Sequence, residues 1–77
     1  MTVVKENISI ETDFITLGQF LKLANIFESG GMIKSFLQTE GVVVNGEQEY
    51  RRGRKLYPKD TIYIEQIDTT FVVTQNE

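Results

Sequence analysis

The chain has 77 residues, of which 40% are hydrophobic, and a formal net charge of −3 at neutral pH. This length predicts a single small domain, residues 1–77, with a folded core over about 8–73. The absence of cysteine and histidine removes disulfides, thiolate metal sites, the commonest zinc ligand and the commonest general base. We therefore expect no enzyme, no cofactor, no metal and no small-molecule substrate. No signal peptide or membrane-spanning segment is evident, so we expect a cytoplasmic protein.

The first third of the chain predicts one strand and one helix. Residues 1–7 show no pattern and are expected to be frayed, whereas residues 8–12 alternate apolar and polar side chains, as a half-buried strand does. Thr16 has the residue type of a helix N-cap. The helix that follows is expected to end between Asn25 and Phe27. Its buried stripe has the spacing i, i+3, i+4 and i+7, at Leu17, Phe20, Leu21 and Ala24.

A second helix is predicted over residues 30–39. Ser29 is its expected N-cap, and Gly41 is placed to end it in a left-handed conformation. Its apolar face consists of Ile33, Phe36 and Leu37. Because only a few residues separate the two helices, we expect them to pack as a compact pair.

The rest of the chain predicts a hairpin and further strands. Valines 42–44 form one strand, Asn45-Gly46 is a two-residue turn signal, and residues 47–50 return as the partner strand. A loop over 51–55, a turn over 57–60, strands over 61–65 and 71–73, and a loose end over 74–77 complete the chain. These elements predict an α+β domain in which two packed helices cover one face of a small, mostly antiparallel sheet.

Basic residues gather in one segment just after the hairpin. Residues 51–59 contain five of the eight lysines and arginines and no acidic residue. The densest part is Arg51, Arg52, Arg54 and Lys55. Because a guanidinium offers planar, paired donors that fit phosphate oxygens, this cluster predicts contact with a polyanion. Glu47 and Glu49 on the hairpin are expected to share a solvated face.

The order of these elements resembles the RNA-binding domain of small-subunit ribosomal protein S4. The resemblance runs from about Thr16 to Ile64 and rests on the helix pair, the hairpin Val42-Val43-Val44-Asn45-Gly46, and Asp60-Thr61-Ile62. Stand-alone bacterial members of the YaaA and YbcJ type are more similar still, since they share Ser29-Gly30-Gly31 and the stretch from Arg51 to Leu56. The chain departs from the general family at Gly30, which replaces an arginine, and at Lys59, which replaces a glycine. The resemblance implies a non-catalytic RNA-binding module that acts near the ribosome.

Several residues outside the basic cluster are further candidates for RNA contact. Gly30 and Gly31 leave the amides at the start of the second helix open to a phosphate, and Lys34 shares the face of Gly30. Lys22 follows Gly18 by four residues on the first helix, where the glycine is attributed to close helix packing, with RNA approach as the alternative. The expected RNA-binding residues are Lys22, Gly30, Gly31, Lys34, Asn45, Arg51, Arg52, Arg54 and Lys55.

Three interpretations stay open from the sequence. Tyr50 and Tyr57 flank the basic loop, either half-buried at a sheet edge or free to stack on an unpaired base. Asn45 has the residue type of a turn former. The favoured function is binding of structured RNA, ribosomal RNA in particular, by the basic loop and the helix pair. The alternative is a protein-interaction module that docks on an acidic partner.

Overall fold

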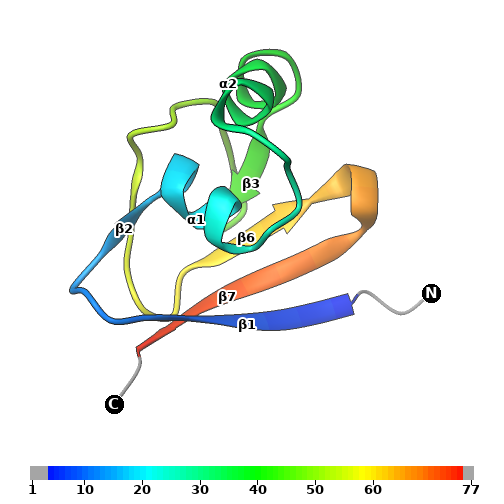
Figure 1. The fold of residues 1–77 in the computed structure, drawn as a ribbon. Helices are drawn as coiled ribbons and strands as arrows, with labels where there is room; N and C mark the ends of the chain where they lie inside the picture. Colours follow the sequence, from blue (N-terminus) through cyan, green and yellow to red (C-terminus); the bar gives the residue numbers. More distant parts are fainter. Residues whose placement is uncertain (1–3, 76–77) are drawn as a thin grey trace.

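The computed structural model describes residues 4–75 and shows an α+β arrangement in which two helices lie on the same side of a sheet (Figure 1). The helices are α1 (Leu17–Leu23) and α2 (Gly30–Thr39), and a short 3-10 helix, η1, spans Glu65–Ile67. The strands are β1 (Val4–Ile10), β2 (Ile15–Thr16), β3 (Val42–Val44), β4 (Glu47–Glu49), β5 (Lys55–Leu56), β6 (Thr61–Ile64) and β7 (Thr69–Gln75).

Five strands form the main sheet in the order β1-β7-β6-β3-β4. The three pairings from β7 to β4 are antiparallel, but β1 and β7 pair in parallel over seven residues each. The main sheet is therefore mixed. The expectation of frayed ends was wrong for residues 4–7 and 74–75, because each end supplies the other's hydrogen-bonding partner. Residues 1–3 and 76–77 lie outside the described part of the chain.

The core lies between the sheet and the two helices. Leu17, Phe20 and Leu21 of α1 are buried, as are Ile33 and Leu37 of α2. The sheet contributes Ile10, Val42, Val44, Ile62, Ile64, Phe71 and Val73. The ring of Phe20 meets that of Phe71 edge-on at 6.0 Å between centroids, which joins α1 directly to β7. The helical and alternating patterns of the sequence thus predicted which faces of the helices and strands are buried.

Local signals also predicted most element ends. Thr16 and Ser29 cap their helices by accepting hydrogen bonds from the amides of residues 19 and 32. Gly41 takes the expected left-handed conformation with φ of 73°. Helix α1 ends at Leu23, a little earlier than expected, because Asn25 is itself left-handed with φ of 60°.

A second, two-stranded sheet was not expected. Strands β2 and β5 pair antiparallel, with Ile15 opposite Leu56 and Thr16 opposite Lys55. Leu56 is fully buried and fixes this small sheet to the core. The end of the predicted 51–55 loop is therefore held as a strand beside the start of α1. None of the helices within residues 4–75 is long and apolar enough to cross a lipid bilayer.

Candidate nucleic-acid interface

The basic loop, residues 51–55, is bound to the first turn of α1 by its backbone. The Leu17 amide donates to the Arg54 carbonyl at 2.8 Å, and the Gly18 amide donates to the Arg52 carbonyl at 2.9 Å. A helix start has amides without partners inside the helix, and here loop carbonyls accept from two of them. The backbone of the loop is therefore fixed to the start of α1.

Gly18 lies against this loop. A Cβ atom at position 18 would lie 3.4 Å from the Arg52 Cβ and 3.5 Å from the Arg52 carbonyl oxygen, and the three nearest heavy atoms all belong to Arg52. The expectation that Gly18 serves packing between the helices was wrong. At these distances a Cβ atom would be in ordinary van der Waals contact with Arg52, so position 18 faces the basic loop.

The Glu49 carboxylate organises the side chains and backbone of the loop from within. One of its oxygens, Oε2, accepts from the amides of Tyr50 and Arg51, each at 3.1 Å, and from Arg51 Nε at 3.0 Å. The other, Oε1, accepts from Arg51 Nη2 at 3.1 Å and from Arg54 Nη1 at 2.8 Å. Five donors thus converge on one carboxyl group.

Glu49 is only 6% exposed, so the expectation that it is solvated together with Glu47 was wrong. The hydrogen bonds from Arg51, and then those from Arg54 and the two amides, hold the pKa of Glu49 far below its ordinary value, although burial acts in the opposite direction. Glu49 is thus a carboxylate at neutral pH. It offsets part of the positive charge of Arg51 and Arg54.

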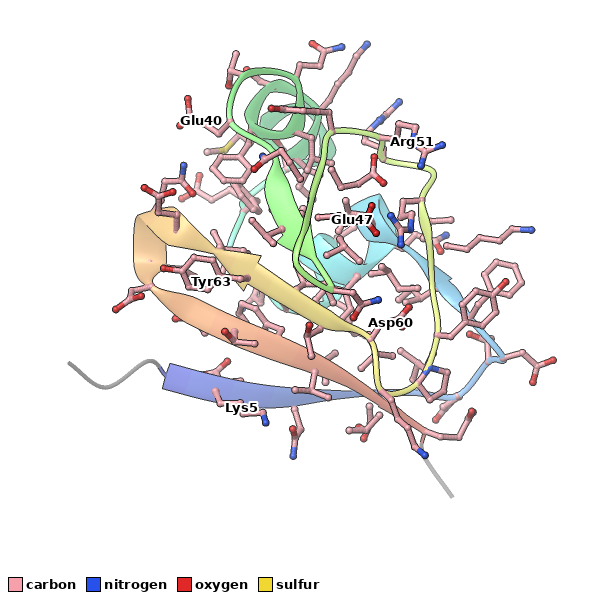
Figure 2. The ribbon with its side chains drawn as sticks, turned by 180° about the vertical axis from the view of Figure 1, so that it is seen from behind. Lys5, Glu40, Glu47, Arg51, Asp60 and Tyr63 are labelled. Carbon is pink, nitrogen blue, oxygen red and sulfur yellow. The ribbon has the colours of Figure 1, made fainter. Side chains whose placement is uncertain are left out.

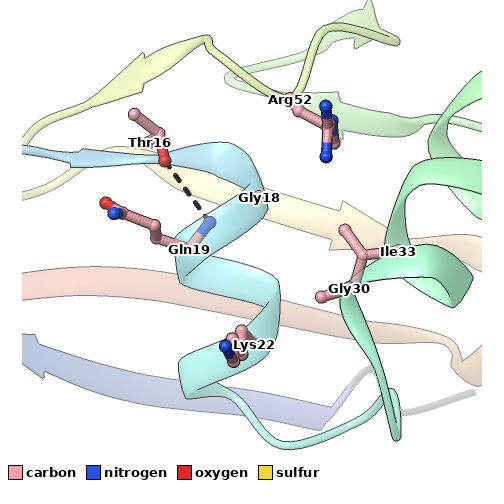
Figure 3. A pocket seen from close by; sticks show the side chains of 7 residues that line it. All are labelled: Thr16, Gly18, Gln19, Lys22, Gly30, Ile33 and Arg52. Atoms are coloured by element: carbon pink, nitrogen blue, oxygen red, sulfur yellow. Dashed lines mark hydrogen bonds between the residues drawn. The ribbon is translucent and has the colours of Figure 1, made fainter.

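Arg52 and Lys22 border a shallow groove between the loop and the two helices. The groove has a volume of about 210 Å³ and is lined by Thr16, Gly18, Gln19, Lys22, Gly30, Ile33 and Arg52. Figure 3 shows Arg52 beside the first turn of α1 and Lys22 toward its other end. Within residues 4–75, neither Arg52 nor Lys22 forms an ion pair, and both are exposed. Both helices and the basic loop therefore meet at one open, positively charged groove.

The remaining predicted site residues differ in where they lie and in how exposed they are. Gly30 lines the groove, whereas Gly31 and Lys34 are exposed on α2 without lining it. Asn45 has a task inside the fold, because its amide group donates to Asp60 Oδ1 and accepts from the Thr61 amide. This agrees with the turn-forming interpretation of Asn45. Arg51 keeps a side chain that is 74% exposed, while that of Arg54 is 28% exposed.

Sequence reasoning missed two residues beside the basic loop. Glu49 gave no signal, since two glutamates on the same side of a three-residue strand do not show which of them is buried. Phe14 is 39% exposed, and its ring lies 5.9 Å from that of Tyr57 and 5.0 Å from Lys55 Nζ. Only the unexpected pairing of β2 with β5 brings Phe14 to the loop.

Residues 8–74 match the family model described as S4 domain, a longer stretch than the one that carried the resemblance. The chain is also similar to the probable ribosome maturation protein RlbA of Bacillus subtilis (strain 168). The two are 60% identical over 58 residues, which cover 75% of this chain and 82% of the relative. The resemblance drawn from the helix pair, the hairpin and the basic loop is confirmed, and the chain belongs to the S4 domain family.

Proposed function

We propose that this chain is a non-catalytic, cytoplasmic protein that binds structured RNA, ribosomal RNA in particular, through the basic loop and the helix pair. The observation that carries the proposal is the groove at which Arg52 and Lys22 meet without acidic partners among the described residues. The S4 domain match supports RNA as the ligand. The description of the Bacillus relative as a probable ribosome maturation protein supports ribosomal RNA as its source.

The charge that is free to meet RNA comes mainly from Arg52, Lys22 and Lys55. Arg51 contributes through its exposed side chain, while Glu49 takes up part of its charge and that of Arg54. The groove is smaller than the roughly 300 Å³ usual for small-molecule pockets. A shallow groove lined by exposed cations fits phosphates on the surface of folded RNA, with recognition of backbone shape rather than of base edges.

The start of α2 lies at one edge of the groove, where Gly30 lines it. Gly30 leaves space, since a Cβ atom there would have no heavy atom within 4 Å. We include Gly30, Gly31 and Lys34 as the outer border of the interface, where the backbone amides and the ammonium group would meet a neighbouring phosphate.

The test compares single charge changes that leave Glu49 fully paired. Arg52→Gln and Lys22→Gln are expected to weaken binding to ribosomal RNA about 3- to 10-fold each at 150 mM salt. Each change should also reduce the slope of log affinity against log salt by about 1, because one phosphate contact is lost. Affinity is measured by fluorescence anisotropy between 100 and 300 mM salt, that is, at roughly physiological ionic strength and above.

Lys5→Gln is the matched control, because it removes the same charge from β1. Figure 2 shows Lys5 and Arg51 at opposite sides of the molecule. Equal losses from Lys5→Gln and Arg52→Gln would contradict the proposal, since binding would then follow net charge alone. Association with ribosomal material that survives complete nuclease digestion would instead support the alternative of docking on an acidic protein.

A further inference from the structure

The β2–β5 pairing places three side chains on one outer face. In an antiparallel pair, residues opposite each other project to the same side, and neighbours along a strand alternate. Ile15 and Leu56 are opposite each other and face the core. Phe14 and Tyr57 lie one residue beyond the paired positions and come together on the outside, where Lys55 also projects.

The side-chain distances agree with this register. The Phe14 and Tyr57 rings lie 5.9 Å apart, tilted by 45°, and Lys55 Nζ lies 5.0 Å from the Phe14 centroid. Both rings are large and open to solvent, with exposures of 39% for Phe14 and 48% for Tyr57. We call these three residues the aromatic platform.

We propose that the aromatic platform binds an unpaired base of the RNA, which stacks on the exposed rings while Lys55 meets the adjoining phosphate. This inference rests on the proposed function and extends it from backbone phosphates to a single-stranded or bulged nucleotide. Every base has a flat π-face, so aromatic rings bind unpaired bases with little regard to sequence.

Continuity with the groove favours RNA as the occupant. Thr16 lies directly opposite Lys55 in the β2–β5 ladder, and the same Thr16 lines the groove that holds Arg52 and Lys22. A strand of RNA whose phosphates lie in the groove therefore reaches the platform without leaving the protein surface. An acidic polymer also suits the platform's own ammonium group, which contacts the ring at cation–π distance.

Fluorescence gives a direct readout of stacking. The chain has no tryptophan, so Tyr57→Trp introduces a unique indole and keeps an aromatic ring in place. The ligands are two RNA hairpins of equal length, one with an internal loop of unpaired adenines and one with those adenines paired to uridines. Quenching of the indole by the looped hairpin, with much weaker quenching by the paired hairpin at equal saturation, is expected.

Tyr50→Trp is the matched control, because Tyr50 is 52% exposed beside the same loop but lies outside the platform. Its fluorescence should respond alike to both hairpins. In a second measurement, Phe14→Leu and Tyr57→Leu keep apolar volume but remove the ring. Each is expected to weaken binding of the looped hairpin about 5- to 10-fold and to leave the paired hairpin within about twofold. Far-UV circular dichroism confirms that the variants fold.

The outcomes separate this inference from the proposed function. Salt-dependent binding of both hairpins, with no selective quenching and no selective loss in the leucine variants, overturns the platform and leaves the phosphate interface standing. Binding of neither hairpin nor ribosomal RNA overturns both. Selective loss of a protein partner after Phe14→Leu, with RNA binding intact, shows that the platform is a protein contact and also overturns the inference.

Discussion

At the scale of single residues, Glu49 is the group on which the shape of the basic loop depends. Neighbouring arginines repel one another, and fixing their side chains costs rotamer entropy. Both effects oppose an ordered conformation of a cationic loop. The buried carboxylate supplies the opposite charge and five accepted hydrogen bonds in one place. It reduces the charge available to RNA, but it holds the backbone that presents Arg52 to the groove.

Glu49→Gln is expected to destabilise the protein by about 1–3 kcal/mol, because the amide donates where the carboxylate accepts and two guanidinium groups lose their counter-charge. Glu47→Gln is the matched control, two residues away on the same strand but exposed. Its effect should stay within about 0.5 kcal/mol. Urea denaturation at pH 7 gives both values, and equal effects would show that Glu49 is an ordinary surface acid.

The same variant gives a pH-dependent signature. The folded pKa of Glu49 lies below its ordinary value of 4.5, so its stabilisation is complete at neutral pH and is lost as the pH falls from 4.5 through the folded pKa. The stability difference between the wild-type protein and Glu49→Gln should therefore shrink as the pH is lowered from 5 toward 2. A difference that is constant over this range would contradict the charged pairing.

At the scale of elements, the end of α2 packs directly against β4, the strand that precedes the basic loop. Gly41 ends α2 with φ of 73° and is buried against β4. A Cβ atom at this position would lie 2.6 Å from Gln48 Nε2 and 2.8 Å from the Glu49 carbonyl oxygen. The helix end therefore touches the residue that organises the loop.

Gly41→Ala is expected to cost about 2–5 kcal/mol, since strain at positive φ adds to a clash with backbone. Gly46→Ala is the control for strain alone, because Gly46 has φ of 85° and no heavy atom within 4 Å of a Cβ atom there. It should cost about 1–2 kcal/mol. Thermal denaturation measures the loss of stability in both variants. Equal losses would contradict the prediction, because they would show that the contacts of the new Cβ atom at position 41 cost no stability.

The elements that the sequence could predict are those with local signals. Caps at Thr16 and Ser29, the glycine at 41 and the Asn45-Gly46 turn each act within a few residues, and the structure has them in place. The parallel pairing of β1 with β7 joins the two ends of the chain and carries no local pattern. The two-residue strands β2 and β5 are too short to show alternation.

The candidate site also has one part that local sequence predicts and another that depends on tertiary structure. Charge density identified the basic loop, since it is a property of neighbouring residues. Lys22 and Arg52 meet only through tertiary structure, and Phe14 reaches Tyr57 only through the β2–β5 register. Glu47 and Glu49 share one side of β4, and only the contacts of Glu49 with Arg51 and Arg54 distinguish the buried glutamate from the exposed one.

At the scale of the whole molecule, a net charge of −3 has to be reconciled with a surface that binds a polyanion. Strand β1 is four strand positions away from β4, or about 19 Å at the usual spacing. The screening length is about 8 Å in physiological salt and about 30 Å at 10 mM. Since the basic loop follows β4 directly, charges on β1 are screened from the loop in the first condition and felt there in the second.

Lys5 and Glu6 are adjacent on β1, exposed and opposite in charge, so they test this directly. At 10 mM salt, Lys5→Gln should weaken RNA binding about twofold and Glu6→Gln should strengthen it about twofold, because each alters the long-range field by one unit charge. At 150 mM salt both effects should vanish, while the loss caused by Arg52→Gln remains. Anisotropy titrations at the two salt concentrations measure all three variants. An effect of Glu6→Gln that persists at 150 mM would place β1 against the RNA and would move the interface away from the groove.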